Sequence, residues 1–430
     1  MSIDMSTVTD SLKDFDTPYY YYDLDKVSEN LEQLGRYFKP PESKIFFPVK
    51  TNDHPLFLRF LKGRGINAEV SSGMELDLAR KIGFSSIIFN SPAKTPEELK
   101  KAVSGGDTVV VLDSLQDLQL LSGYLSARTQ VGIRISSSSR RQDKFGMNMK
   151  DASDALHAIS GNSLLSFAGF HFHLGSFIYS TAAYRRMFEN IISMMKKLPA
   201  ELFKDMQFVD IGGGLQCGHK IKQSILERSM FYYTFKYSIP HRYLLKKERE
   251  YLRKMEDFDK EKIISRLYSE TAYQKSIVEE LVGSSLKIYL EPGTGIAGDA
   301  VDVYSRVLAR KDNKVLIDAS RFIQHSHDIF WHPVYNVSEP ARDIREEYVF
   351  GPLNTPHDMY SRCYVGGRLE NNSLVRVRGM GAYSFSFHSS FSKPQLSVVV
   401  RHGGNIDMVT GPEEFSEKYC RYPLGKQPGG

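Results

Sequence analysis

The feature that most constrains the fold is an alternation of strand-like and helix-like segments from residue 43 to residue 211. Short apolar, β-branched runs are each followed by a stretch with the apolar spacing of an amphipathic helix. Units this short and this evenly spaced favour one parallel (β/α)8 TIM barrel over separate domains. The predicted strands are 43–49, 66–70, 86–89, 108–112, 130–135, 166–172, 206–211 and 286–290, and the predicted helices are 54–63, 73–82, 96–104, 115–125, 151–159 and 181–198.

The other segments predict additions to this barrel. A β-rich run at 17–25 precedes an amphipathic helix, for which Asp25 is the expected cap. Residues 218–280 have helical spacing and many Lys, Glu and Tyr, which predicts a helical insertion: a solvated excursion, or a lid or partner-binding element. Valine-rich alternating runs at 299–420 predict a mostly β domain, and the N-terminal strand is a candidate to join it. The expected domains are 1–40, 41–298 and 299–420.

Composition bounds the class of protein. The chain has 430 residues, of which 41% are hydrophobic and 25% charged, as is usual for a soluble protein with a sizeable core. Its net charge of +5 is too small over this length to indicate nucleic-acid binding. There is no apolar run of about 18 residues and no apolar signal-peptide core, so we expect no membrane span. Three widely spaced cysteines suggest neither a disulfide framework nor a zinc site, and we expect a cytoplasmic protein.

A lysine follows the first predicted barrel strand. Lys50 stands in the run Phe-Pro-Val-Lys-Thr-Asn at 47–52. Barrels of this kind present their reactive groups at the C-terminal ends of the strands. Burial there lowers the pKa of an amine and makes it a usable nucleophile toward a carbonyl group. A strand-end lysine is most often only solvated, so its significance depends on what the other strand ends carry.

The strand that ends near residue 172 carries two histidines. His171 and His173 point to the same face of that strand, because side chains alternate along it. Gly175 lets backbone approach a ligand, and Ser176 adds a hydroxyl group. Two interpretations are open: a ligand-binding strand end, or core histidines beside a turn.

The next strand ends in a run of glycines. Gly212, Gly213 and Gly214 follow Asp210 and would leave bare backbone N–H groups to cradle an anion, as phosphate sites after late barrel strands do. The alternative is a flexible turn that binds no ligand. The position directly after a strand favours the anion site.

The strand at 286–290 ends in Glu291, a carboxylate that would face whatever Lys50 faces. Residues 293–298 also match G-x-G-x-x-G, and Asp318 ends a later strand about 20 residues on, as in a dinucleotide fingerprint. We reject that match, because the segment that should be its helix alternates like a strand and is β-branched.

Two later groups carry polar chemistry. The turn-rich loop at 351–358 ends in a titratable pair, His357 and Asp358. Tyr383 ends the run Gly-Met-Gly-Ala-Tyr at 379–383, whose glycines suit a hydroxyl group placed on a ligand. Three histidines within 325–332 fit the spacing of no common metal site, and we expect no bound metal.

A lysine amine, a histidine, an anion cradle, a strand-end carboxylate and a tyrosine together suit a cofactor that has an aldehyde and a phosphate. Pyridoxal phosphate (PLP) is that cofactor. Lys50 would bond to its aldehyde, and Glu291 would keep its ring nitrogen protonated. A protonated ring withdraws electrons strongly, which favours decarboxylation over racemisation.

These motifs resemble the alanine-racemase-fold (fold-type III) PLP-dependent decarboxylases, which include ornithine, arginine, diaminopimelate and carboxynorspermidine decarboxylases. The resemblance covers about residues 17 to 410, apart from the insertion. It implies that Lys50 carries PLP, that His173 stacks on the ring and that Glu291 pairs with the ring nitrogen. It also implies that the family works as a head-to-tail homodimer, in which the loop after Gly351 enters the partner's site. The further cofactor contacts that it implies are Glu69, Arg134, Ser176, Gly212, Gly213, Gly214, Gly293, Thr294 and Tyr383.

The chain departs from the family at two places. Thr294 stands where the family's Glu-Pro-Gly-Arg has arginine. In the family's Gly-Pro-x-Cys-Asp/Glu loop, Asn354 replaces the cysteine that returns a proton to the α-carbon, and Thr355 replaces the acid that binds a distal amine. Asn354 has no acidic proton, so His357 or His173 would have to serve instead.

We therefore expect a PLP-dependent amino-acid decarboxylase of specialised (natural-product) metabolism. It resembles the decarboxylases of antibiotic and siderophore pathways, some of which act on modified or carrier-bound amino acids. Thr355, Asp358 and Asp318 are the expected substrate contacts. Two alternatives remain: a non-catalytic homologue that binds a partner, which Lys50 disfavours, and a racemase or epimerase, which Glu291 disfavours.

Overall fold

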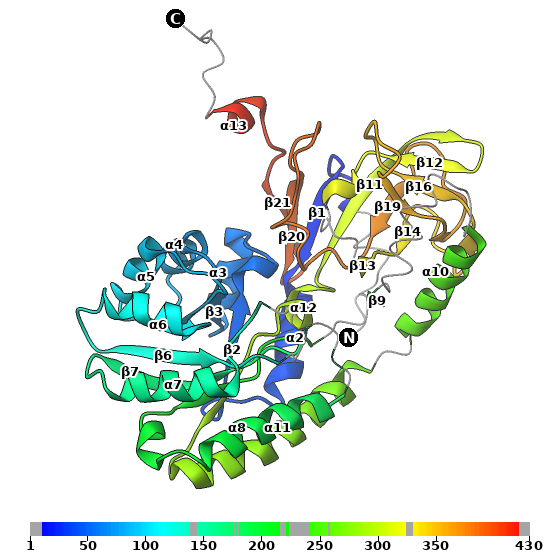
Figure 1. Cartoon of the computed structure of the whole chain (residues 1–430). Helices are drawn as coiled ribbons and strands as arrows, with labels where there is room; N and C mark the ends of the chain where they lie inside the picture. Colours follow the sequence, from blue (N-terminus) through cyan, green and yellow to red (C-terminus); the bar gives the residue numbers. More distant parts are fainter. Residues whose placement is uncertain are drawn as a thin grey trace, which may run out of the picture. The chain divides into compact units, whose positions relative to one another are not determined.

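The chain forms two compact units in the computed structural model (Figure 1). One contains residues Glu29–Gln216 and Asp259–Ile296, and the other contains Met1–Ser28, Cys217–Phe258 and Ala297–Gly430. The structure describes residues 11–137, 144–175, 178, 180–215, 221–222, 241–256, 259–323 and 330–420.

The first unit is a closed barrel of parallel strands, in the order β10-β2-β3-β4-β5-β6-β7-β8. β10 pairs with both β2 and β8, which closes the barrel. The predicted TIM barrel is therefore confirmed. The strands are β2 (Ser43–Pro48), β3 (Asn67–Val70), β4 (Ile87–Asn90), β5 (Thr108–Leu112), β6 (Thr129–Arg134), β7 (Leu165–His171), β8 (Phe208–Asp210) and β10 (Lys287–Leu290).

Helices alternate with these strands, and side-chain caps fix where several of them begin. Ser72, Ser114 and Asn148 each accept hydrogen bonds from the first turn of their helix. Thr95 and Glu98 form the reciprocal capping box at the predicted start of its helix. The helical segments are η1 (Val49–Thr51), α3 (Pro55–Gly63), α4 (Gly73–Ile82), α5 (Pro96–Val103), α6 (Leu115–Ser122), α7 (Met149–Ser160), α8 (Ala182–Met195), η2 (Ala200–Phe203) and α11 (Lys260–Val282).

Side chains fill the barrel interior. Phe208 and Tyr289 stack with ring centroids 4.3 Å apart, within a buried cluster that also contains Phe46. Gly169 on β7 makes room for this packing, because a Cβ atom there would lie 2.2 Å from the Phe208 carbonyl oxygen. The interior is thus a packed core, and chemistry is confined to the ends of the strands.

The second unit is built on an eleven-stranded sheet. β1 pairs antiparallel with β11 and parallel with β20, so the N-terminal strand belongs to this sheet. β11 also confirms that the segment from Val301 is a strand and not the helix of a dinucleotide site. The strands are β1 (Tyr19–Asp23), β11 (Val301–Lys311), β12 (Lys314–Ile317), β14 (Val334–Asn336), β15 (Ile344–Arg345), β16 (Tyr348–Phe350), β17 (Met359–Ser361), β18 (Tyr364–Val365), β19 (Leu374–Val377), β20 (Ser397–His402) and β21 (Asn405–Thr410).

The cap predicted at Asp25 is wrong by two residues. Helix α2 (Leu24–Gly35) begins directly after β1, and Asp23 Oδ1 accepts the Lys26 N–H at 3.0 Å. Asp25 Oδ1 instead accepts the Gly403 N–H at 3.0 Å. The remaining short segments are α12 (Gly293–Ala297), η3 (Arg321–Ile323) and α13 (Phe415–Tyr419).

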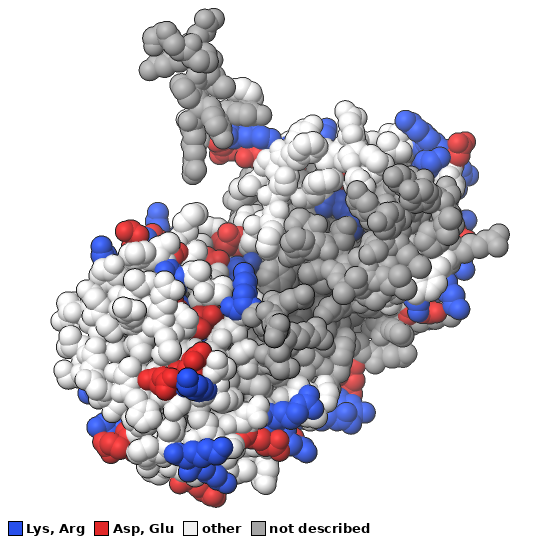
Figure 2. All heavy atoms as spheres, viewed as in Figure 1, with Lys and Arg blue, Asp and Glu red and all other residues white. Residues whose placement is uncertain are grey.

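The predicted helical insertion contains α10 (His241–Glu256) and most of α11. The two helices belong to different units: α10 to the unit with the large sheet and α11 to the barrel unit. The insertion is not wholly helical, because β9 (Ile221–Lys222) pairs with β13 (Phe330–Trp331). None of the helices in the described residues is long and apolar enough to cross a membrane. On the face drawn in Figure 2, basic and acidic side chains are interspersed over the described part.

Candidate active site

Five barrel strands bring ionisable side chains to their C-terminal ends. Lys50 lies in η1 directly after β2, and Glu69 lies in β3. His171 and Asp210 are the last residues of β7 and β8, and Glu291 follows β10. The C-terminal ends of parallel strands gather at one mouth of a barrel, so these side chains share one site.

Lys50 and Glu69 form an ion pair at this mouth. Lys50 Nζ lies 2.5 Å from Glu69 Oε2, and the lysine side chain is 40% exposed whereas the glutamate is fully buried. The pKa of Glu69 is raised to about 7, mainly because burial disfavours the charged carboxylate; the Lys50 ammonium opposes this rise and the Glu291 carboxylate adds to it. A carboxyl group with this pKa can hold or release a proton near neutral pH, directly beside the lysine amine.

This raised pKa predicts how stability depends on pH. A carboxyl pKa that is higher in the folded state stabilises fully below the unfolded value of 4.5, and the stabilisation is lost as pH rises through about 7. In the wild-type apoprotein, Glu69 should lower the unfolding free energy by roughly 3 kcal/mol as pH rises over this range. We expect this contribution to be absent in Glu69→Gln. Urea unfolding at several pH values measures it, with the exposed Glu97→Gln as control. Parallel curves for wild type and Glu69→Gln would contradict the assignment.

Three buried carboxyl groups interact electrostatically at this barrel mouth. Glu69 Oε1, Asp210 Oδ2 and Glu291 Oε1 each have no hydrogen-bond partner among the described residues. Burial raises the pKa of Asp210 well above its usual range, and the nearby Glu291 charge adds to this effect. Polar atoms of His171, Asp210 and Glu291 all lie within 4.8 Å of one another. Such a cluster suits a cationic group that would supply the missing hydrogen bond.

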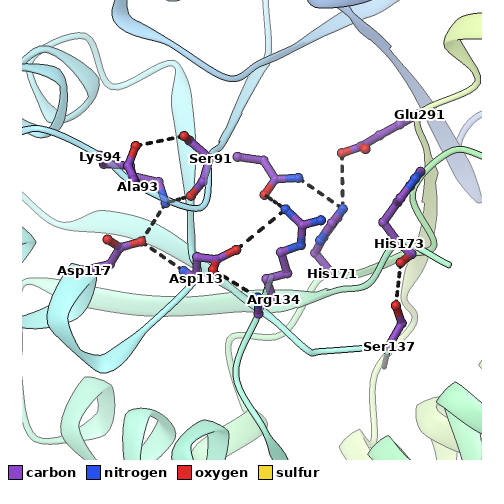
Figure 3. Close-up of polar contacts among 12 residues, drawn as sticks. Ser91, Ala93, Lys94, Asp113, Asp117, Arg134, Ser137, His171, His173 and Glu291 are labelled. Atoms are coloured by element: carbon purple, nitrogen blue, oxygen red, sulfur yellow. Dashed lines mark hydrogen bonds and ion pairs between the residues drawn. The ribbon is translucent and has the colours of Figure 1, made fainter. Parts of the chain in front are cut away.

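His171 lies within this cluster, fully buried. Its Nε2 atom is 3.5 Å from Glu291 Oε1 and 3.2 Å from Asn90 Nδ2 (Figure 3). Burial lowers the pKa of His171 well below its usual range, and the positive charge of Arg134 lowers it further. The ring is therefore neutral, and it does not compensate the charge of Glu291.

Arg134 belongs to a second polar network behind His171. Its guanidinium group donates to Asn90 Oδ1 at 3.3 Å and lies 3.6 Å from Asp113 Oδ1 (Figure 3). It also covers the ring of Phe145, at 4.5 Å from the centroid. Sequence reasoning missed Asn90 and Asp113, although both stand at strand C-terminal ends like the residues that it selected.

The glycine turn after β8 holds His173 in place. The Gly213 N–H donates to His173 Nδ1 at 3.1 Å, and the Gly212 N–H donates to Asp210 Oδ1 at 2.8 Å. Burial lowers the pKa of His173 to about 4, so this ring is neutral too. Two of the three amides that the sequence offered as an anion cradle are therefore already used, and Gly214, at φ +98°, presents the third.

The other predicted contacts of the barrel unit lie close by in sequence. Gly293 and Thr294 form the first turn of α12. A Cβ atom on Gly293 would lie 2.3 Å from Thr51 Oγ1, so only glycine fits there. Ser176 lies outside the described residues.

The remaining predicted residues belong to the second unit: Asn354, Thr355 and His357 on a loop, and Tyr383, Asp318 and Asp358. Tyr383 follows Gly381, where a Cβ atom would lie 1.7 Å from the Ala297 carbonyl oxygen, and it adopts a left-handed φ of +66°. Asp318 accepts hydrogen bonds from Thr17 Oγ1 at 2.5 Å and Ser305 Oγ at 2.6 Å. A substrate contact of Asp318 stays a prediction.

The barrel-mouth residues fit a phosphorylated, cationic heteroaromatic aldehyde. The lysine amine suits the aldehyde, and the orphaned oxygen of Glu291 suits a protonated ring nitrogen. The glycine turn packs closely against the end of β10, where any side chain would collide: a Cβ atom on Gly213 would lie 2.5 Å from the Glu291 carbonyl oxygen. Fold and site thus define a barrel enzyme of the PLP-dependent class.

Comparison with known proteins gives the family. Residues 24–234 match the pyridoxal-binding domain of pyridoxal-dependent decarboxylases. The diaminopimelate decarboxylase of Aquifex aeolicus is 25% identical over 424 residues, which cover 93% of this chain and 90% of that protein. The L-glutamyl-[BtrI acyl-carrier protein] decarboxylase of Niallia circulans is 22% identical over 441 residues, covering 95% and 94%. The crystal structure of Helicobacter pylori diaminopimelate decarboxylase complexed with L-lysine has a TM-score of 0.78 at 21% identity, and the match covers 97% of this chain and all of that one.

The chain belongs to the fold-type III PLP-dependent decarboxylases, as the sequence motifs predicted. It is a PLP-dependent amino-acid decarboxylase. The match to a pyridoxal-binding domain also confirms the predicted cofactor, PLP.

Proposed function

We propose that this decarboxylase acts on an amino-acid derivative whose distal end carries no free ammonium group, in specialised metabolism. Support comes from the loop at residues 351–358, where the family has the acid that binds a distal amine. The loop contains a single acidic residue, Asp358. The observation that carries the proposal is the direction in which this carboxylate faces.

Asp358 is directed into its own unit. Its side chain is 1% exposed and accepts hydrogen bonds from the Leu353 N–H at 2.8 Å and the Arg321 N–H at 2.6 Å. Its carbonyl oxygen accepts the Gly351 N–H at 2.7 Å, which closes the loop. A Cβ atom on Gly351 would lie 2.4 Å from the carboxylate, so the loop is built around this group. A substrate contact of Asp358 would require these bonds to break.

The rest of the loop displays no carboxylate. Asn354 and His357 are exposed, and Thr355 is half-buried. An amide and a hydroxyl group pair well with amide, ester or carbonyl groups, whereas an ammonium group is bound best by a carboxylate. Thr294 in place of the family arginine is a separate change, which removes a cation that binds carboxylate or phosphate.

A carrier-bound aminoacyl group is one substrate of this chemistry. The Niallia circulans relative acts, by its name, on a glutamyl group attached to an acyl-carrier protein. We extend this substrate class to the present chain as a proposal. We also propose, from the family resemblance, a cytoplasmic homodimer in which the loop of one subunit completes the site of the other.

We assign roles to the barrel residues as follows. When bound, PLP supplies an aldehyde that bonds to amines and a protonated ring that withdraws electrons from the α-carbon. Lys50 would hold the cofactor covalently, and Glu69 would hold or move a proton at Nζ. Glu291 would pair with the ring nitrogen, and His173 would stack on the ring. Because Asn354 has no acidic proton, we assign the return of a proton to the α-carbon to His357.

The substrate proposal predicts what a restored acid would do. We expect Thr355→Asp combined with Asn354→Cys to raise kcat/KM for free amino acids with a distal amine about 10- to 100-fold, since hydrogen bonds to charged groups contribute ~1.5–3 kcal/mol. Carbon dioxide release is measured for lysine, ornithine and diaminopimelate, and for glutamate presented free and as a pantetheine thioester.

The matched control is Thr355→Asn with Asn354→Cys, which adds polarity without charge and should leave these values unchanged. We expect the wild-type enzyme to prefer the thioester over every free diamino acid. Efficient release of carbon dioxide from free diaminopimelate by the wild type would overturn the proposed substrate class and leave the decarboxylase family untouched.

A further inference from the structure

Asn90 is the last residue of β4, and its side-chain amide lies between a guanidinium group and an imidazole. Arg134 Nη1 donates to Asn90 Oδ1 at 3.3 Å, and Asn90 Nδ2 lies 3.2 Å from His171 Nε2. Asn90 is 6% exposed and His171 is fully buried. The three side chains form a chain of contacts. It ends at Glu291, whose contact with His171 is drawn in Figure 3.

The orientation of the amide follows from the chemistry of its neighbours. A guanidinium group only donates hydrogen bonds, so the oxygen of Asn90 must face Arg134. The NH₂ group then faces His171, and Nε2 of that ring must accept. An imidazole that accepts at Nε2 is neutral and carries its proton on Nδ1.

Arg134 is itself fixed, which makes this orientation stable. Asp113 Oδ1 lies 3.6 Å from the guanidinium, and the Phe145 ring covers it. Asp113 in turn accepts the Gly146 N–H at 3.0 Å. Burial also lowers the pKa of His171 well below its usual range, in agreement with a neutral ring.

The tautomer of His171 decides what Glu291 can bind. His171 Nε2 lies 3.5 Å from Glu291 Oε1, close enough for a proton on Nε2 to be shared with the carboxylate. With its lone pair on Nε2, His171 offers Glu291 no proton. Glu291 Oε1 then keeps its capacity for another donor, and it has no hydrogen-bond partner within the described part of the chain.

We propose that Asn90 is a positioning residue that holds His171 in the Nδ1–H form and thereby reserves the Glu291 carboxylate for the ring nitrogen of the cofactor. The claim about Glu291 rests on the role proposed above for that residue. The claim about the His171 tautomer concerns this chain alone. Asn90 contacts neither substrate nor Lys50 in this scheme, and it acts through His171.

The test measures the tautomer directly. In apoprotein labelled with ¹⁵N-histidine, the His171 ring signals are assigned by their loss in His171→Gln. We expect the wild type to show a protonated Nδ1. In Asn90→Leu, which removes the donor, and in Asn90→Asp, which replaces the donor by an acceptor, we expect the proton to move to Nε2. Ser91→Ala is the control, because it changes the neighbouring residue's hydrogen bond to the Ala93 carbonyl oxygen only.

The second readout is cofactor affinity, measured by equilibrium dialysis with PLP. We expect Asn90→Leu to weaken binding about 10- to 100-fold, because Glu291 then pairs with His171, and Ser91→Ala to bind like the wild type. A protonated Nε2 in the wild type, or a proton that stays on Nδ1 in both Asn90 variants, overturns the assignment. A moved proton with unchanged PLP affinity overturns the link to Glu291. Failure of the wild type to bind PLP would instead refute the cofactor assignment and leave the tautomer result standing.

Discussion

Replacement of Lys50 by arginine is expected to abolish the covalent attachment of PLP and to lower kcat by ~10³-fold or more. Arginine keeps a positive charge beside the buried Glu69, so the ion pair at the barrel mouth survives and the fold is not put at risk. A guanidinium group stays protonated at neutral pH and does not condense with an aldehyde. The variant therefore separates the charge of Lys50 from its nucleophilicity.

Borohydride reduction followed by peptide mapping measures the attachment. In the wild type the reduced cofactor should mark the peptide that contains Lys50, and in Lys50→Arg no peptide should be marked. Lys81→Arg, at an exposed position on α4, is the matched control and should be labelled at Lys50 like the wild type. Label on a different lysine of the wild-type chain would refute the assignment of the active-site amine.

Removal of Glu248 is expected to destabilise the second unit by about 3–5 kcal/mol. This residue of α10 is 2% exposed and pairs with Arg362, whose Nη1 donates to Glu248 Oε1 at 2.9 Å. Glu248 Oε2 accepts the Arg362 N–H at 2.9 Å and the Ser361 hydroxyl at 3.0 Å. Glu248→Ala removes the carboxylate that accepts from the buried Arg362 guanidinium, and the weaker compensation of that desolvated charge is the source of the loss.

Denaturant unfolding measures this effect through the fluorescence of the single tryptophan, Trp331, which belongs to the same unit. The control is the double variant Glu248→Leu/Arg362→Met, which replaces both charges by apolar groups of similar size. We expect it to recover most of the lost stability, because such replacements are often neutral. Equal stability of Glu248→Ala and the wild type would show that α10 is not anchored by this pair.

The barrel and its reactive end were predictable because they depend on local pattern. The periodicity of strands and helices predicts where each strand ends. Lys50, Asp210 and Glu291 each stand at the C-terminal end of such a strand. Parallel pairing then brings these ends together without knowledge of any side-chain contact. The family resemblance needed only these motifs and their order.

The glycine turn shows where local pattern falls short. The run after Asp210 predicted three bare amides, but Gly212 donates to Asp210 and Gly213 donates to His173. Whether a backbone N–H is available depends on which side chain the neighbouring strand places against it. That information lies in the register between β7 and β8, which the sequence does not display.

Asn90 was missed for a related reason. An asparagine at a strand end has no distinctive signal, since its amide can donate and accept in many settings. Its meaning appears only when Arg134 and His171 are known to lie on either side of it. Those residues stand on β6 and β7, and the barrel is what brings them to β4.

The position of β1 has a consequence for synthesis on the ribosome. In the order of synthesis this strand precedes the barrel, whereas β11 and β20, which flank it in the sheet, both follow the barrel. Until these are made its four consecutive tyrosines have no partner strands, a state that favours association with other nascent chains. Slow translation of the segment from β11 to β20 should therefore lower the yield of active enzyme, and a chaperone that binds β1 before then should restore it.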